Sequence, residues 1–458
     1  MENQTAAEGI KAYFEGLSAS SSVLFSLPFA LLLISFALIP ILFPHLWGKH
    51  WYKSVISLVA GVPVAGFFIY KDWHTLANTG LDYGTFICLL GALFVISGGI
   101  FIRGSYPPTP AVNISILIIG ALLANVIGTT GASMLMIRPL LRVNTLRSRK
   151  IHIIVFFIFI VSNGAGLLTP LGDPPLFLGF LKGVPFTWTF NLWKEWLTLI
   201  GLLLAIFFVI ERRQFARESD EIKKHIMSSA RGDFGIDGLH NIILLGVVLS
   251  LIVISGSLIY PNAFGGRQVF GEPAGSVVSR VVQMFGMSLV ALISHIFTNQ
   301  GIRKANNFSV EPMLEVAVLF AGIFMAMIPV LLILEVRGAS MNISHPSQYF
   351  WMAGGLSSVL DNAPTYLTFT SLAKGSLQLS GEGLHALAED PFGAIALAAI
   401  SCGAVFMGAV TYIGNGPNLM VKSIAENHDI KMPLFFGYLA WSFLVLIPIF
   451  LLITFLFF

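Results

Sequence analysis

The chain has 458 residues, of which 56% are apolar and only 11% charged, and its formal net charge is +3. A soluble protein usually has about 25% charged residues, so this composition excludes an ordinary soluble protein and indicates a membrane protein. Cys88 and Cys402 both lie in apolar stretches, which excludes a disulfide framework and a Cys-rich metal site. Residues 1–20 form a polar N-terminal segment without the basic region of a signal peptide.

Ten apolar stretches are long enough to cross a bilayer, because a spanning helix needs about 20 such residues. The first half contains five of them, at residues 21–43, 53–70, 82–102, 151–181 and 192–210. The second half contains the other five, at residues 239–260, 276–298, 314–334, 391–422 and 434–457. The charged residues 211–238 separate the halves. We therefore expect a transmembrane repeat at 21–210, a cytoplasmic linker at 211–238 and a second repeat at 239–458.

Two further apolar stretches, at about residues 112–141 and 349–373, are interrupted near their middles by GTTGAS and DNAPT. We interpret both as re-entrant hairpins, since irregular backbone at membrane depth is tolerated where it is buried or lines a cavity. A long tilted helix with a packing kink is the alternative in each case.

The distribution of basic residues predicts the orientation. When both hairpins return to the side they came from, 18 of the 26 Lys and Arg residues fall on one side. Cytoplasmic loops carry this excess, so we expect both termini outside the cytoplasm, in a multi-pass protein of the inner (plasma) membrane. Five crossings per half is an odd number, so the second half is inverted relative to the first. Inverted repeats recur in secondary transporters.

Three pairs of matching segments support the repeat. Residues 86–94 resemble 317–325, residues 129–135 align with 361–367, and residues 169–175 match 411–417. The offsets are 231, 232 and 242 residues. The expected fold is therefore an all-α polytopic membrane protein with two inverted-topology repeats, each of five transmembrane helices and one re-entrant hairpin.

Two motifs, Gly-Asp-Pro-Pro at 172–175 and Gly-Asn-Gly-Pro at 414–417, lie inside apolar stretches. Proline removes an amide donor and clashes with the preceding turn, so both stretches are predicted to be discontinuous helices. Each break exposes the carbonyl end of one half-helix and the amide end of the next, which carry opposite partial charges. Such breaks, meeting near the midplane, form the ion and substrate sites of secondary transporters.

Two carboxylates, Asp173 and Asp361, lie at these interruptions. A charge at membrane depth is costly and marks a functional site. In general, burial raises the pKa of a carboxylate and a bound cation lowers it, so such a group can exchange a proton for sodium. Capping of a helix N-terminus is the alternative role, because Asp is a favoured cap.

The Na⁺ candidates are Asp173, Asp361 and Asn362. Oxygen and amide groups around them suit a hard cation. The other predicted ion- or substrate-binding residues are Thr129, Thr130, Ser133, Asn163, Thr169, Gly172, Thr365, Thr411, Gly414, Asn415 and Asn418.

The sequence lacks GxxxxGK[ST], HExxH and any Cys/His cluster. ATP is therefore not expected to drive transport directly, and we expect no cofactor, no enzymatic activity and no nucleic-acid partner. The expected partners are the lipid bilayer and a small ion or carboxylate. A channel or membrane enzyme without coupled transport is the hypothesis from another class.

The motifs SNGAGLLTPLGDPP (162–175), LDNAPT (360–365) and TYIGNGPN (411–418) resemble the ion transporter superfamily. This group includes NhaD-type sodium/proton antiporters and citrate-transporter-like carriers. The resemblance implies a scaffold domain, a transport domain, elevator-like alternating access and a homodimer. It also implies that Asp173, Asp361 and Asn362 belong to the ion site.

Sodium/proton antiport is the first functional hypothesis, and sodium-coupled symport of citrate or a dicarboxylate is the alternative. The first hairpin reads TTGAS where symporter relatives have a Ser-Asn-Thr signature. The motifs also contain no Arg or Lys. Both features favour a cation over a multiply charged anion as the substrate.

Overall fold

The computed structural model describes residues 2–42, 50–104, 106–221, 223, 235–256, 267–270, 272–379 and 383–458. The helices of the first half are α1 (Glu2–Glu15), α2 (Ala19–Leu42), α4 (His50–Lys71), α5 (Trp73–Ser97), α6 (Pro110–Val143), α7 (Ile151–Ile160), η1 (Gly164–Leu167), α8 (Pro174–Leu181), η2 (Phe186–Leu192) and α9 (Trp193–Ala216). Those of the second half are α11 (His240–Ile254), α13 (Ala274–Phe297), α14 (Gln300–Ala305), α15 (Glu311–Arg337), η4 (Gly338–Met341), α16 (Pro346–Ser357), α17 (Asn362–Ser376), α18 (His385–Glu389), α19 (Pro391–Met407), α20 (Gly416–Glu426) and α21 (Phe435–Phe457).

The only strands among these residues form two short antiparallel pairs. Strand β1 (Phe101–Arg103) pairs with β2 (Gly235–Asp237), and β3 (Gln268–Val269) pairs with β4 (Glu272–Pro273). The first pair joins the end of the α5 segment to residues of the predicted linker.

Within the described ranges, seven helices are long and apolar enough to cross a membrane, or up to eight if the bent α1–α2 pair counts as one span. Three shorter apolar helices, at Ile151–Leu167, His240–Ile254 and Pro391–Met407, fall in three of the other predicted crossings. The prediction of an all-α polytopic membrane protein is therefore confirmed. The inverted repeat and the re-entrant character of the hairpins stay predictions.

Two predicted boundaries differ most from the structure. Helix α5 begins at Trp73, nine residues before the predicted crossing, because the Asp72 carboxylate caps it at Thr75. Asp82 therefore lies inside the helix instead of at its start. Helix α9 continues to Ala216, six residues into the predicted linker. Its residue Glu211 is fully buried.

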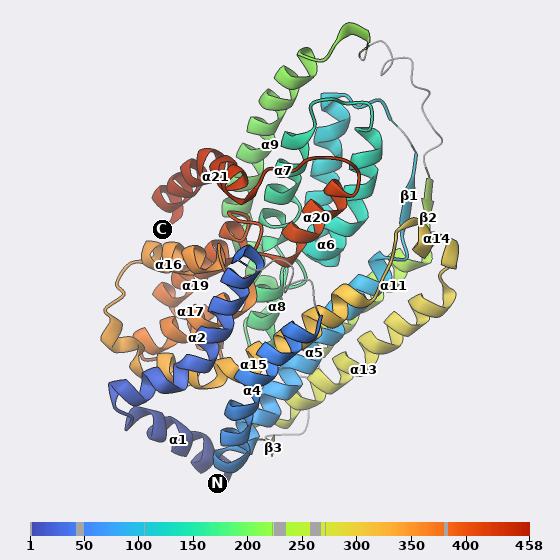
Figure 1. Ribbon diagram of the computed structural model, residues 1–458. Coiled ribbons are helices and arrows are strands. Elements are labelled where there is room, and N and C mark those ends of the chain that lie inside the picture. The colour runs from blue at the N-terminus through green and yellow to red at the C-terminus, as the bar shows by residue number, and fades with distance from the viewer. Residues whose placement is uncertain are drawn as a thin grey trace.

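Helices that are far apart in the sequence pack side by side (Figure 1). Helix α4 packs on α15, and α5 packs on α13, so elements of the two halves alternate. Helix α16 packs on α19 and α17 on α8, while α7 lies against α9. Helices α5 and α15 also contact α8 and α17, respectively, which brings the broken helices next to the long ones.

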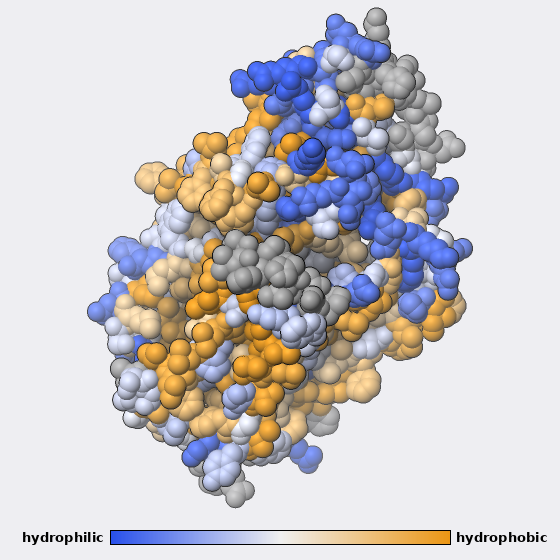
Figure 2. Space-filling model, viewed as in Figure 1, coloured by the Kyte–Doolittle hydropathy of each residue, from blue (hydrophilic) through white to orange (hydrophobic). Residues whose placement is uncertain are grey.

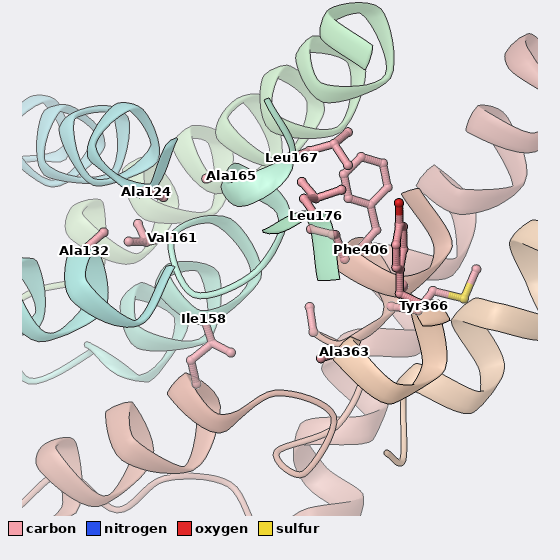
Figure 3. Packing of buried hydrophobic residues seen from close by; sticks show 14 of the residues in the cluster. Ala124, Ala132, Ile158, Val161, Ala165, Leu167, Leu176, Ala363, Tyr366 and Phe406 are labelled. Carbon is pink, nitrogen blue, oxygen red and sulfur yellow. The ribbon is translucent and has the colours of Figure 1, made fainter. Parts of the chain in front are cut away.

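Many large apolar side chains are exposed, as a bilayer requires, and on the face that Figure 2 shows the hydrophilic residues gather toward the top and the upper right, where β1, β2 and α14 lie in Figure 1. The interior is densely packed around the discontinuous helices, where Leu167, Leu176, Tyr366 and Phe406 belong to one buried cluster (Figure 3). The broken segments are thus enclosed by protein.

Candidate ion-binding site

Four backbone interruptions surround the site. Helix α6 is broken at Gly128, whose φ of 76° is a left-handed conformation that favours glycine. Helix α16 ends at Ser357 and α17 begins at Asn362. The breaks between α7 and α8 and between α19 and α20 coincide with the motifs at 172–175 and 414–417. Interruptions therefore exist where the sequence predicted them.

The break in α6 is tied to the break before α8. The N–H of Thr129, the first residue after the kink, donates to the Gly172 carbonyl at 2.8 Å. At Gly172 the backbone approaches Gly166 so closely that a Cβ would lie 2.2 Å from the Gly166 carbonyl oxygen. Glycine is required here because two irregular segments touch through their backbones. The contact places Asp173 next to the start of the second α6 arm.

Asp173 is the centre of this arrangement. It is 1% exposed, with extended backbone at the N-terminus of α8, and its carboxylate makes no capping hydrogen bond. Instead, Oδ1 accepts a hydrogen bond from Thr129 Oγ1 at 2.7 Å, and Oδ2 accepts one from Asn362 Nδ2 at 2.7 Å. The side chain therefore faces both predicted hairpins, and the capping alternative does not describe it.

Asn362 is held in the orientation that presents its amide N–H to Asp173. The Ser357 hydroxyl donates to Asn362 Oδ1 at 2.7 Å, which leaves Nδ2 for the carboxylate. A Cβ on Gly408 would lie 2.3 Å from Asn362 Oδ1, so the backbone of the α19 break also confines this side chain. Asn362 itself is 1% exposed.

Asp361 has a different role in the structure. Its carboxylate accepts a hydrogen bond from the Ala363 N–H at 3.1 Å and caps α17. The Thr365 hydroxyl donates to the Asp361 carbonyl oxygen at 3.1 Å, inside the same turn. The capping alternative therefore describes Asp361. It stays next to the site through its neighbour Asn362.

A second network of amides lies beside the carboxylate. Asn415 Nδ2 donates to the Ser162 carbonyl and to Asn163 Oδ1, both at 3.1 Å. Asn163 Nδ2 donates to Asn418 Oδ1 at 2.7 Å, and Asn418 Nδ2 donates to the Gly408 carbonyl at 2.8 Å. These contacts join the α7 break to the α19 break across the predicted boundary between the two halves.

The hydroxyl groups of the candidate set divide into three kinds. Thr169 and Thr411 each donate to a backbone carbonyl at 2.5 Å, on Asn125 and Ser358 respectively. Thr411 Oγ1 in turn accepts from the Gly414 N–H at 3.2 Å. Ser133 pairs with the Ser162 hydroxyl at 2.8 Å. Half-buried Thr130 has no side-chain hydrogen bond in the part of the chain that the structure describes, so only Thr129 of the two adjacent threonines reaches Asp173.

The chemistry of the site is that of oxygen and amide groups. Within the described ranges, no group of three or more His, Cys, Asp or Glu could hold a metal ion. None of the hydrogen bonds that the described residues make to Asp173 comes from a basic side chain. A buried carboxylate with only neutral partners favours a small cation or a proton as its ligand.

Sequence reasoning missed a second polar region between α5, α8, α15 and α17. A cavity of about 190 Å³ there is lined by charged residues of all four helices or their ends. Lys182 pairs with Asp82 at 2.5 Å, and Lys374 pairs with Glu335 at 2.8 Å. Arg280 Nη1 donates to Asp82 at 2.7 Å. The hydropathy pattern placed Asp82 at a membrane boundary, so its partners could not be inferred.

Comparison with known proteins adds the family. A comparison with curated proteins gives no match. The family model described as "Putative citrate transport" matches residues 18–458, nearly the whole chain. This agrees with the resemblance to citrate-transporter-like members of the ion transporter superfamily, and it makes the chain a multi-pass secondary transporter. The chain belongs to this citrate-transport family.

Proposed function

We propose that the protein is a sodium/proton antiporter in which Asp173 binds the sodium ion and the proton in alternation. The environment of the Asp173 carboxylate is the observation that supports this function best. One carboxylate, 1% exposed, accepts hydrogen bonds from Thr129 and Asn362 and has no basic partner among the described contacts. A charge in such a place requires a neutralising ligand.

The proposed sodium site consists of oxygens already close to Asp173. The Asp173 carboxylate and the Thr129 hydroxyl oxygen are hard ligands of the kind that an alkali cation takes, whereas Asn362 presents its amide N–H, and not its oxygen, to the carboxylate. Asp361, the residue before Asn362, adds negative charge nearby without a hydrogen bond to Asp173. Sodium and the proton are substrates in this scheme, and each neutralises the same carboxylate.

Alternating access would follow from the position of Asp173 between elements. Its partners come from α6 and α17, while the surrounding breaks belong to α7–α8 and α19–α20. Equivalent close contacts, Gly166 with Gly172 and Gly408 with Gly414, recur at an offset of 242 residues. They support the predicted repeat. We propose, on the same basis, an elevator-like motion in a homodimer of the inner membrane.

The family match and the lysine-containing cavity favour a second candidate, sodium-coupled uptake of citrate or a dicarboxylate. Lys182 and Lys374 lie at the ends of α8 and α17 and line the cavity of about 190 Å³. A polycarboxylate would replace Asp82 and Glu335 as the anionic partner of these lysines. In this case Asp173 would hold the coupling sodium ion.

Everted vesicles with a pH-sensitive dye separate the candidates. Antiport predicts that added sodium or lithium releases the dye quench, and that Asp173→Asn abolishes this response. Thr130→Val is the matched control, because its side chain does not reach the carboxylate. Radiolabelled citrate uptake into proteoliposomes, driven by a sodium gradient and without proton movement, would overturn antiport in favour of symport.

A further inference from the structure

A second cavity lies away from Asp173, between α6 and the segment formed by β1, β2 and α11. It has a volume of about 740 Å³, within the range of ligand-binding pockets. Its walls are mainly aliphatic side chains such as Leu123, Pro139 and Leu245, and Arg103 is the one charged residue among the described residues that line it. The cavity therefore suits an apolar ligand with an anionic end.

The cavity opens toward the lipid-facing surface. Three of its lining residues, Ile119, Val126 and Ile242, are 49%, 41% and 47% exposed. In a spanning segment, exposed aliphatic side chains face hydrocarbon. Water gains little in such a space because it lacks hydrogen-bond partners, and an empty gap forfeits dispersion contacts. An acyl chain from the bilayer satisfies both conditions.

Cationic groups gather at one end of the cavity. Arg103 lines it and pairs with Asp237 at 2.8 Å. Arg142 donates to the carbonyl of the lining residue Ile102 at 2.5 Å, and Arg138 precedes it by one helical turn. The described contacts give neither Arg138 nor Arg142 a carboxylate partner, and the Nε atom of each is buried without a hydrogen-bond acceptor. Among the described residues, these three arginines and Asp237 leave a local excess of positive charge.

The predicted repeat indicates what this cationic end lacks. The offset of 232 residues between the two hairpin motifs places Arg142 against Lys374. Lys374 pairs with Glu335 of α15 at 2.8 Å. The offset of 231 residues for the long helices places Glu335 against Gly104, beside Arg103. The first half therefore has a glycine, next to the cation Arg103, at the position where the second half has its acceptor, and an external anion can fill that place.

We propose that this cavity binds one anionic phospholipid from the bilayer, with acyl chains between α6 and α11 and the phosphodiester at Arg103 and Arg142. Arginine recognises phosphate oxygens through paired N–H donors. A phosphate with net negative charge offsets the excess positive charge, whereas a zwitterionic headgroup does so less well. The predicted orientation places this end at the cytoplasmic leaflet, which carries the anionic lipids.

Native mass spectrometry of the delipidated full-length protein in mild detergent tests this site. Phosphatidylglycerol should bind about tenfold more tightly than phosphatidylcholine with the same chains, and Arg142→Gln should weaken phosphatidylglycerol binding roughly tenfold. Lys194→Gln, which removes an exposed cation at the start of α9, is the matched control and should change nothing.

A second variant separates the acyl-chain contact from the charge. Gly246 lines the cavity, and a Cβ there meets nothing within 4 Å, so Gly246→Phe can fill the space without a backbone clash. It should reduce the binding of both lipids. Equal binding of the two lipids, unchanged binding in both variants, or equal competition by glycerol 1-phosphate would overturn the proposal. The last outcome would indicate a free-phosphate site.

Discussion

The contact between Thr129 and Asp173 allows a sharp test of the proposed site. Thr129→Val keeps the side-chain shape but removes the hydroxyl that donates to Asp173 Oδ1 at 2.7 Å. A hydrogen bond to a charged group contributes about 1.5–3 kcal/mol. Because about 1.4 kcal/mol corresponds to a factor of ten, the half-saturating sodium concentration should rise by roughly one to two orders of magnitude. The hydroxyl stabilises the ionised carboxylate, which is the form that binds a cation.

The assay is sodium-dependent dye dequenching in everted vesicles across a sodium titration at fixed pH. Thr129→Ser restores a hydroxyl and should recover most of the sodium response. Thr130→Val removes the neighbouring hydroxyl, which makes no described side-chain hydrogen bond, and should behave like the unmodified protein. Equal sodium dependence of Thr129→Val and Thr130→Val would refute the assignment of Thr129 to the site.

Three other predictions address the surroundings of the site. Gly408→Ala should displace Asn362, since the added Cβ would lie 2.3 Å from Asn362 Oδ1. The resulting strain of about 1–3 kcal/mol should lower transport more than tenfold at normal expression. Gly416→Ala should be neutral, because a Cβ there meets nothing within 4 Å. Lys374→Gln should lower the free energy of unfolding by about 1–2 kcal/mol in chemical unfolding. This is less than the loss of a fully buried ion pair would cost, because Glu335 is partly exposed and also binds Lys11. Lys422→Gln, which removes an exposed pair with Glu426, should have a smaller effect, and equal effects of the two variants would contradict the reasoning. Burial disfavours the ionised Glu218, but hydrogen bonds from Ser148, the Arg149 N–H and Arg147 hold its pKa below the ordinary value. Its contribution to stability is therefore complete above the ordinary carboxylate pKa and is lost as pH falls through the lowered folded value. Hydrogen exchange at the Arg149 amide should accelerate over that range, and an unchanged protection factor would contradict this.

The sequence allowed the positions of the interruptions to be predicted because their cause is local. Proline and glycine at 172–175 and at 414–417 end a helix wherever it packs, and the structure has breaks at both. The all-helical membrane class follows in the same way from hydropathy. These features depend on neighbouring residues and on the bilayer, which the composition already reveals.

The partners of Asp173 could not be predicted, because they are distant in the sequence. Thr129 is 44 residues away and Asn362 is 189 residues away. The choice between Thr129 and Thr130 depends on the kink at Gly128, which rotates one hydroxyl toward the carboxylate and not the other. Similarly, Asp82 meets Arg280 across 198 residues. Such contacts depend on tertiary packing, for which a single sequence provides no distance.

Asp173 is proposed to bind the sodium ion, and an equilibrium binding measurement tests this binding without transport. Sodium that binds only the folded protein should raise the unfolding free energy by about 2.7 kcal/mol at a concentration one hundred times Kd. Thermal unfolding of purified protein, with choline chloride at equal ionic strength as the control, should show this sodium-specific stabilisation. Asp173→Asn should abolish it, because a neutral amide gives the cation no charge to bind. The same sodium-specific stabilisation in Asp173→Asn would contradict the account.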